Sequence, residues 1–222
     1  AGEHTASISL KLTHLGLDIS QDLCVTNLRH ILTAAQENEV RVTIDMEGSD
    51  YTDTTLRLYR TAHDEYGFDN VGAVIQSMLR RSRKDMQQLA DERARVRLCK
   101  GAYMEPASIA YPDKTDVDAA YVDIMRAWFE HESPGILELA THDEAIISEA
   151  IDMIRSYAIT EDRYEFQMLY GVRTSRQDSL VAEGFPVRVY MPFGESWYPY
   201  FMRRLAERPA NLWFFLRSFV RG

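Results

Sequence analysis

Four charged side chains lie in, or directly after, short apolar runs that are expected to form strands. They are Lys11, Asp45, Arg97 and Lys100. A charge placed in an apolar strand is costly unless it is paired. Each residue taken alone can be a structural ion pair, or the point where a strand runs out into solvent. Because all four stand near the carboxyl end of their runs, we expect them to converge on one polar site.

A second candidate group belongs to a helix expected near residues 196–208. One face of this helix is apolar and the other carries Tyr200, Arg203, Arg204 and Glu207. Two adjacent guanidiniums can bind a carboxylate in a bidentate manner, and a tyrosine offers a flat wall to an apolar ring. The alternative is a solvated face on which Arg203 and Glu207 form an i,i+4 ion pair.

The elements that position these residues alternate regularly along the chain. Strands are expected at residues 7–12, 40–46, 71–76, 95–102, 136–140, 164–169 and 187–192, each followed by a helical pattern. Ser82-x-x-Asp85 and Thr174-x-x-Gln177 resemble capping boxes, and Asp143 resembles an N-cap. Strict alternation predicts a parallel sheet with crossover helices, and largely apolar strands predict that both sheet faces are covered.

Two folds satisfy this alternation, a doubly wound sheet and a TIM barrel. No G-x-G-x-x-G and no G-x-x-x-x-G-K-[ST] occurs at any strand–helix turn, which weakens a doubly wound nucleotide-binding fold. In a TIM barrel the chemistry lies at the carboxyl ends of the strands, where the polar residues fall here. His142, at the end of the fifth run, keeps two interpretations: an exposed residue beside the cap, or a hydrogen-bond donor into the barrel mouth.

Composition excludes several classes of protein. The chain has 222 residues, 45% of them hydrophobic, and a net charge of −9, which disfavours nucleic acid or an anionic lipid surface as the main partner. Its two cysteines form neither a disulfide framework nor a CxxC metal pair, so we predict no metal site and a reducing, cytoplasmic location. No apolar stretch is long enough to span a membrane.

Six segments together resemble proline dehydrogenase. They are SISLKLTHLG at residues 7–16, IDME at 44–47, VIQ at 74–76, RLCKGAYMEP at 97–106, ATHD at 140–143 and YPYFMRRLAERPAN at 198–211. The resemblance extends over nearly the whole chain, so residues 1–222 are expected to form one barrel domain. The C-terminal part looks most like the dehydrogenase domain of bifunctional proline utilization A proteins.

This resemblance implies a distorted (β/α)₈ TIM barrel that uses FAD to oxidise L-proline to Δ1-pyrroline-5-carboxylate. Hydride would pass from proline C5 to flavin N5, and the electrons would go on to a quinone in the first step of proline catabolism. The family also implies a pyrroline-5-carboxylate dehydrogenase domain, fused or separate, and a peripheral place at the inner membrane. Proline-analogue inhibitors are expected to bind at the substrate site.

The resemblance also implies roles for individual residues. Arg203, Arg204 and Lys11 would clamp the proline carboxylate, while Tyr190 and Tyr200 would pack on its ring. Asp45 and Arg97 would be catalytic, with Asp45 beside the substrate and Arg97 near the flavin N5 edge. The residues implied for the FAD site are Met46, Gln76, Arg97, Lys100, Gly101, Ala102, Tyr103, Thr141, His142, Gln167, Tyr170 and Glu207. No histidine stands as a dedicated base, so we expect the substrate amine to lose its proton before or during binding, with Asp45 as the alternative acceptor.

Two other functions fit the residues. Lys11 or Lys100 could serve a cofactor-free barrel aldolase as a Schiff-base lysine, or the chain could be an inactive barrel fragment. The sequence shows seven strand–helix units where the family barrel has eight, and only six residues precede Ser7. We therefore expect the first β-α unit to be supplied by residues before Ala1 or by a partner segment, or FAD binding to be weakened.

Overall fold

The computed structural model describes residues 6–194, and the chain divides into two compact units, residues 1–188 and 189–222. The described strands are β1 (Ser7–Leu10), β2 (Arg41–Ile44), β3 (Val71–Gln76), β4 (Val96–Cys99), β5 (Leu137–Ala140), β6 (Tyr164–Leu169) and β7 (Val187–Tyr190). The described α-helices are α1 (Gln21–Glu37), α2 (Thr52–Arg60), α3 (Ser82–Asp91), α4 (Lys114–Glu130), α5 (Glu144–Ser156) and α6 (Thr174–Ala182). Short helical turns lie at η1 (Thr13–Leu15), η2 (Ser49–Tyr51), η3 (Thr61–Glu65) and η4 (Glu161–Arg163).

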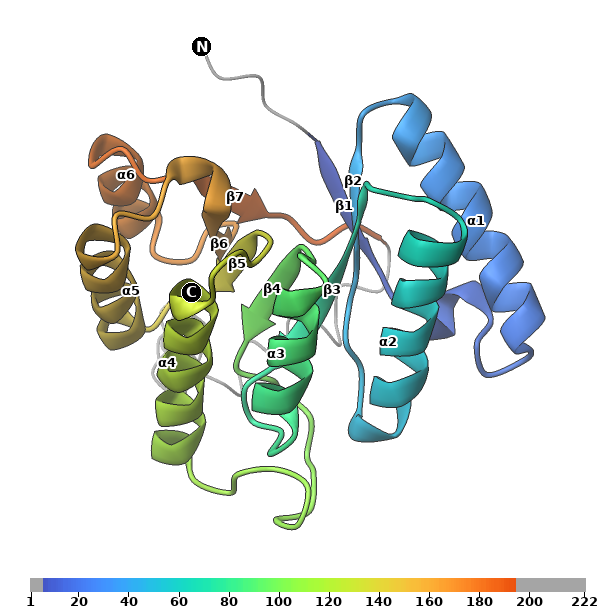
Figure 1. Ribbon diagram of the computed structural model, residues 1–222, viewed down its shortest axis with the longest axis horizontal. Helices are drawn as coiled ribbons and strands as arrows, with labels where there is room; N and C mark the ends of the chain where they lie inside the picture. Colours follow the sequence, from blue (N-terminus) through green and yellow to red (C-terminus); the bar gives the residue numbers. More distant parts are fainter. Residues whose placement is uncertain (1–5, 195–222) are drawn as a thin grey trace, which may run out of the picture. The chain divides into compact units, whose positions relative to one another are not determined.

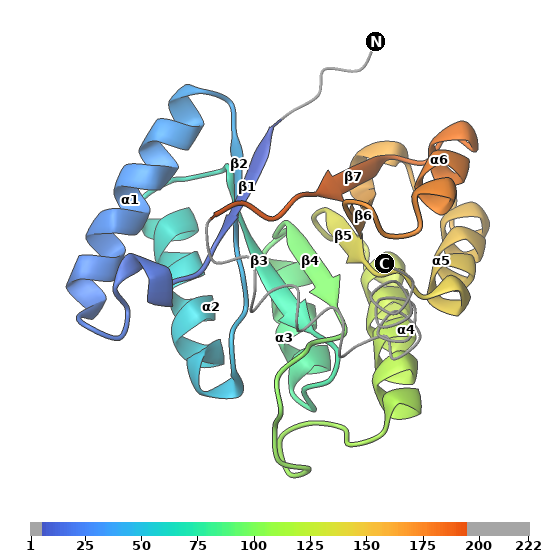
Figure 2. The ribbon, with the colours of Figure 1, turned by 180° about the vertical axis from the view of Figure 1, so that it is seen from behind.

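The strands lie in the sheet in the order in which they occur in the chain, from β1 to β7. Strands β1 to β6 pair in parallel, for example Ser7 with Arg41 and Val42 with Val71. A doubly wound sheet reverses its strand order part-way, and this sheet does not. In the first unit the sheet is curled and the helices cover one of its faces (Figure 1). The view from behind shows the other face (Figure 2). The fold is therefore α/β of the distorted TIM-barrel class, as predicted.

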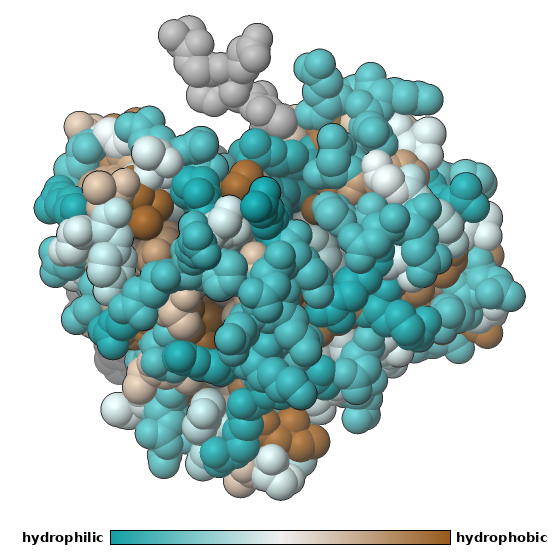
Figure 3. All heavy atoms as spheres, viewed as in Figure 1, coloured by the Kyte–Doolittle hydropathy of each residue, from teal (hydrophilic) through white to brown (hydrophobic). Residues whose placement is uncertain are grey.

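The two faces of the sheet differ in polarity because successive strand residues point to opposite sides. The residues that face the helices are apolar and fully buried, including Val42, Ile44, Val96 and Leu98. The residues that alternate with them are polar on several strands: Ser9, Thr43, Arg97, Glu138 and Gln167. The prediction of apolar strands thus holds for one face only. On the outside, the helices present a largely hydrophilic surface (Figure 3).

The strand predictions were correct in number and order but too long at the ends. Strands β3 and β6 have the predicted bounds, whereas the other five are shorter. Gly101 shows why β4 stops early: its φ of 100° turns the chain out of the sheet, a conformation that glycine adopts without steric cost. After β2 the backbone still pairs once more, since Asp45 N donates to Leu10 O at 2.8 Å.

The two predicted helix starts are correct, since α3 begins at Ser82 and α6 at Thr174, but neither helix start forms a capping box. Ser82 Oγ donates to Gln76 O at 2.5 Å and makes no cap for α3. Gln177 Nε2 donates to Leu169 O and Val172 O, at 3.0 and 2.9 Å. Both side chains therefore attach a helix to the carboxyl end of the preceding strand.

Candidate active site

The guanidinium of Arg97 is the centre of the polar site. It projects from β4 and is only 8% exposed. Its Nε donates to Gln167 Oε1 on β6 at 2.6 Å, and its Nη1 donates to Ser9 Oγ on β1 at 3.0 Å. The same Nη1 donates to Asp45 Oδ1, just after β2, at 2.8 Å. One side chain thus joins residues from four strands, and it brings together three residues predicted for the site.

Asp45 stands at the carboxyl end of β2 with 22% of its side chain exposed. Burial raises the pKa of Asp45 above its usual value, although Arg97 and Lys11 oppose that rise. A partly buried carboxylate beside a fixed guanidinium can accept or hold a proton at a defined atom. This environment fits either of the two predicted uses of Asp45, ordering the cations or accepting a proton.

Glu138 on β5 lies beneath Arg97 and is 2% exposed. Its Oε1 accepts from Arg95 Nη1 at 2.6 Å, and its Oε2 lies 3.7 Å from Arg97 Nε. Burial opposes ionisation of Glu138, but Arg95 and Arg97 outweigh it and lower its pKa. Arg95 itself approaches the backbone of Gly72 closely, since a Cβ on Gly72 would lie 2.8 Å from Arg95 O and 2.9 Å from Arg95 Cζ.

The polar cluster continues from Gln167 towards β7. Gln167 Nε2 donates to Glu165 Oε1 at 2.9 Å, and Glu165 binds Arg188 through two hydrogen bonds of 2.7 and 2.8 Å. The hydrogen bond to Glu165 raises the pKa of Arg188. Carboxylates and guanidiniums therefore alternate across the inner face of the sheet, so that each buried charge has a partner.

Gln76 and Gly101 lie beside this cluster and pack closely against each other. Gln76 Nε2 donates to Met46 O at 3.2 Å and to Glu47 O at 2.9 Å. Its Oε1 is buried and has no hydrogen-bond partner among the described residues. A Cβ on residue 101 would lie 2.7 Å from that oxygen and 2.6 Å from Met78 Sδ. No side chain would fit at residue 101. The orphaned amide oxygen of Gln76 fits a hydrogen-bonding ring system such as that of a flavin.

Lys100 belongs to a separate cluster of charges at the ends of β4 and β5. Its Nζ contacts Asp118 Oδ1 and lies 2.8 Å from Asp143 Oδ2, while Lys114 binds the same two carboxylates. The Lys100 hydrogen bond lowers the pKa of Asp143 to about 2. As predicted, Asp143 is the N-cap of α5, where its Oδ1 accepts from Ala145 N at 3.2 Å.

The Nε2 atom of His142 accepts a hydrogen bond. One of the two interpretations from the sequence had the ring as a donor into the barrel mouth, and Nε2 does not have that role. Leu169 N donates to His142 Nε2 at 2.9 Å, so a proton on the neutral ring lies on Nδ1. Thr141, which is buried, uses its Oγ1 to accept from Asp143 N at 3.1 Å. Both residues therefore shape the β5–α5 turn beside the site.

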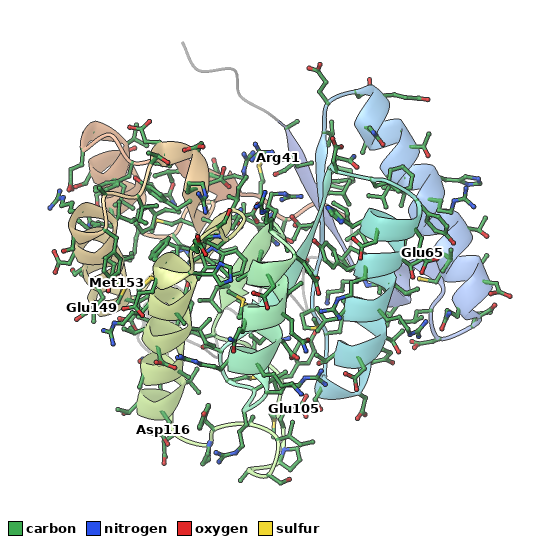
Figure 4. All side chains as sticks on the ribbon, in the orientation of Figure 1. Arg41, Glu65, Glu105, Asp116, Glu149 and Met153 are labelled. Atoms are coloured by element: carbon green, nitrogen blue, oxygen red, sulfur yellow. The ribbon has the colours of Figure 1, made fainter. Side chains whose placement is uncertain are left out.

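Glu47 and Glu105 connect loops at the carboxyl ends of the strands through hydrogen bonds. The Glu47 carboxylate accepts from Thr13 N at 3.2 Å and from Thr13 Oγ1 at 2.9 Å. Glu105 accepts from Ser49 N at 2.7 Å and from Ser49 Oγ at 2.6 Å. Figure 4 shows Glu105 at the end of the first unit opposite Arg41, which begins β2. Both sets of hydrogen bonds thus lie at the carboxyl ends of the strands, at the same end as the polar cluster.

The remaining predicted residues differ in position. Met46 is buried and Lys11 is half-buried, whereas Ala102, Tyr103 and Tyr170 are exposed. Tyr190 ends β7. Four predicted residues lie outside the described part of the chain: Tyr200, Arg203, Arg204 and Glu207.

Sequence reasoning assigned no role to several residues of this site. They are Ser9, Glu47, Arg95, Glu105, Glu138, Glu165 and Arg188. A signal for two of them was available, because Glu138 and Glu165 are charges inside otherwise apolar strands, the same pattern that identified Arg97. The two loop glutamates carry no such signal, since acidic residues in loops are ordinary.

Comparison with known proteins gives this geometry a family. A family model described as "Proline dehydrogenase" matches residues 2–217. The chain belongs to the proline dehydrogenase family. It is 42% identical to "Proline dehydrogenase 1" of Bacillus subtilis (strain 168) over 216 residues, which are 97% of this chain and 70% of that protein. It is 43% identical to "Proline dehydrogenase" of Deinococcus radiodurans over 219 residues, again 97% of this chain and 70% of that protein.

Solved structures of proline utilization A share the fold. The structure from Bdellovibrio bacteriovorus, inactivated by N-propargylglycine, matches with a TM-score of 0.80 and 27% identity, over 89% of this chain and 24% of that chain. A Bradyrhizobium japonicum proline utilization A matches with a TM-score of 0.80 and 23% identity, over 95% of this chain and 25% of that chain. The chain thus spans about a quarter of these proteins. The resemblance seen in the sequence is confirmed, and the proline dehydrogenase family is one of oxidoreductase enzymes.

None of the helices described within residues 6–194 is long and apolar enough to cross a membrane. Those residues also contain no group of three or more His, Cys, Asp or Glu side chains that could hold a metal ion.

Proposed function

We propose that this chain oxidises L-proline to Δ1-pyrroline-5-carboxylate with FAD as its cofactor. The observation that carries the proposal is the guanidinium of Arg97, fixed by Asp45, Ser9 and Gln167 at the mouth of the polar face. Proline loses a hydride from C5 and a proton from its nitrogen, so the site must stabilise negative charge on the acceptor and remove one proton. A rigid cation beside a buried carboxylate suits both tasks.

Residues at the carboxyl ends of β3 to β6 hold the cofactor in this proposal. When bound, FAD supplies the hydride acceptor, its ring nitrogen N5. The orphaned Gln76 Oε1, against which Gly101 packs closely, supports a hydrogen-bonding ring in this place. Met46, Ala102, Tyr103, Thr141, His142, Gln167 and Tyr170 complete the proposed wall, with Glu207 behind Tyr200 or Arg203 and Lys100 near the ring system. Arg97 favours the anionic reduced form by its charge.

The substrate site uses cations and aromatic rings. Lys11, Arg203 and Arg204 bind the proline carboxylate, because guanidinium pairs match carboxylate geometry. Tyr190 and Tyr200 pack on the apolar ring and exclude water. A cationic pocket also lowers the pKa of the substrate ammonium and so favours the neutral amine.

The acceptor of the amine proton is open to a direct test. If the amine loses its proton before or during binding, the pH dependence of flavin reduction by proline keeps its controlling pKa in Asp45→Asn. If Asp45 is the acceptor, that pKa disappears from the variant's profile. Stopped-flow reduction across pH, in the wild type and in Asp45→Asn, distinguishes the two routes.

Electrons leave the site for a quinone in this proposal, which places the protein in the cytoplasm and peripherally at the inner membrane. The similarity to proline utilization A supports a pyrroline-5-carboxylate dehydrogenase domain, fused or separate, as the partner that takes the product. Quinone reduction with vesicles present and absent tests the membrane part of this proposal.

A Schiff-base aldolase is less well supported by the contacts. An attacking lysine needs a free amine, whereas Lys100 Nζ lies between the carboxylates of Asp118 and Asp143 and contacts both. Borohydride trapping of a carbonyl substrate on Lys100, lost in Lys100→Ala, would instead support that function.

The deciding experiment adds L-proline anaerobically to the purified protein supplied with FAD. We expect proline to bleach the flavin absorbance and, with a dye acceptor present, to drive steady dye reduction. Arg97→Gln should lower the rate by about 10²-fold, the usual cost of removing a stabilising donor. Bound flavin that proline neither bleaches nor turns over would overturn the proposal and favour an inactive fragment.

A further inference from the structure

Glu138 is a buried carboxylate to which the proposed reaction gives no role. It lies on β5 directly opposite Arg97 in the β4–β5 register. Its two oxygens face different arginines: Oε1 accepts a hydrogen bond of 2.6 Å from Arg95, and Oε2 lies 3.7 Å from Arg97 Nε. The second distance is beyond hydrogen-bond range, so Glu138 acts on Arg97 through its charge.

Arg95 does not depend on Glu138 alone for its position. Its guanidinium also donates to Thr43 Oγ1, Val42 O and Asn70 O, at 3.2, 2.8 and 3.2 Å. These acceptors hold Arg95 at the amino end of the strands, away from the polar mouth. Glu138 therefore separates two guanidiniums that would otherwise repel each other across the inner face of the sheet.

The charges near Arg97 differ in how firmly they stay ionised. Arg95 and Arg97 lower the pKa of Glu138 despite its burial, whereas burial raises the pKa of Asp45. The two arginines thus favour the ionised form of Glu138, which places a second negative charge beside Arg97.

We propose that Glu138 acts through Arg97 as a positioning residue whose charge limits the positive field that Arg97 presents to a bound flavin. This inference rests on the proposed function. Removing the charge of Glu138 leaves the unit positive charge of Arg97 less compensated, and a less compensated cation stabilises the anionic reduced flavin over the oxidised one. Loss of Glu138 should therefore raise the midpoint potential of the bound flavin.

The test measures flavin midpoint potentials in the FAD-loaded protein. Glu138→Gln keeps the shape and removes the charge, and we expect reduced flavin to gain about tenfold in binding over oxidised flavin, about 30 mV for a two-electron couple. Glu138→Asp, which keeps the charge, should restore the wild-type potential. The matched control is Asp85→Asn, which removes a buried carboxylate paired with an arginine, Arg81, on α3. It should lower stability without moving the potential.

A second variant allows the same test if the Glu138→Gln protein does not fold. Arg95→Met combined with Glu138→Gln removes the pair together and leaves no unpaired guanidinium. Glu138 lies nearer to Arg97 than Arg95 does, so removing both charges should still raise the flavin midpoint potential. The rise should be smaller than in Glu138→Gln alone. A flavin-loaded Glu138→Gln or double variant with the wild-type potential would overturn this inference while leaving the proposed function intact. Failure of the wild type to reduce its flavin with proline contradicts the proposed function itself.

Discussion

Asp45 shows how one residue of the site couples to pH. Its pKa is higher in the folded protein than the usual 3.8, chiefly through burial. The folded state therefore binds this proton more tightly than the unfolded state, and stability falls as pH rises from 3.8 through the raised pKa. The carboxylate costs stability at neutral pH, which is typical of groups kept for chemistry rather than for packing.

We therefore expect Asp45→Asn to gain in stability relative to the wild type as pH rises from about 3 to 7. Asparagine does not titrate, so it avoids the cost of ionising a buried carboxyl. Urea denaturation at a series of pH values measures the difference between the two proteins. Asp152→Asn, on an exposed position of α5, is the control. A difference that moves the other way with pH would show that Arg97 dominates the environment of Asp45.

The sequence could predict the central residues but not all their partners. Arg97, Asp45 and Gln167 were expected at one end of a parallel sheet, and they meet there because carboxyl ends of parallel strands share an edge. Lys100 shared the same pattern, yet it contacts Asp118 and Asp143. Which carboxylate a cation meets depends on the path of the following loop, and residue spacing does not determine that path.

At the scale of elements, the start of α5 combines a cap with an ion pair. Asp143 caps the helix and binds Lys100, and its pKa of about 2 means that its charge stabilises the fold above pH 3.8 and stops doing so as pH falls through 2. Asparagine caps a helix as well as aspartate. Asp143→Asn should therefore remove only the charge contribution, about 1 kcal/mol for a carboxylate that is 27% exposed and partly screened.

Denaturation of wild type and Asp143→Asn at pH 7 and at pH 2 measures this contribution. The difference should be fully present at pH 7 and much smaller at pH 2, where about half of the folded molecules carry a protonated Asp143. An equal loss at both values would mean that the substitution damages the cap rather than the ion pair.

The loop between β4 and α4 is held through Glu105 and Ser49. Glu105→Ala removes both hydrogen bonds, so we expect faster proteolysis within residues 100–113 and a stability loss of about 1 kcal/mol. Glu105→Gln can still accept from Ser49 N and should lose less. Glu149→Ala, an exposed substitution on α5 (Figure 4), is the matched control. If Glu105→Ala is cleaved no faster than that control, the contact does not hold the loop.

At the scale of the whole molecule, close packing around Arg95 determines how much stability is lost when Gly72 is substituted. Gly72→Ala would place a methyl group 2.8 Å from Arg95 O and 2.9 Å from its guanidinium carbon. The guanidinium must then move from Glu138 and its other acceptors. We expect a loss of about 2–3 kcal/mol in the free energy of unfolding, from overpacking and a weakened buried ion pair.

Gly48→Ala provides the comparison for that loss. Gly48 has a φ of −59°, and a Cβ there would have no neighbour nearer than 3.6 Å. Its unfolding free energy should stay within about 0.5 kcal/mol of the wild type. Equal losses in both variants would show that backbone freedom, rather than the space around Arg95, explains the effect of Gly72→Ala.

The order of the strands has a consequence for how the chain folds. Each strand pairs with the next one to be synthesised, so each pairing has to close only one strand–helix unit. The contacts of Arg97 do not follow this rule, because Ser9 is 88 residues away and Gln167 is 70 residues away. The scaffold can therefore assemble progressively from the ribosome, while the polar cluster around Arg97 closes only after β6 has emerged.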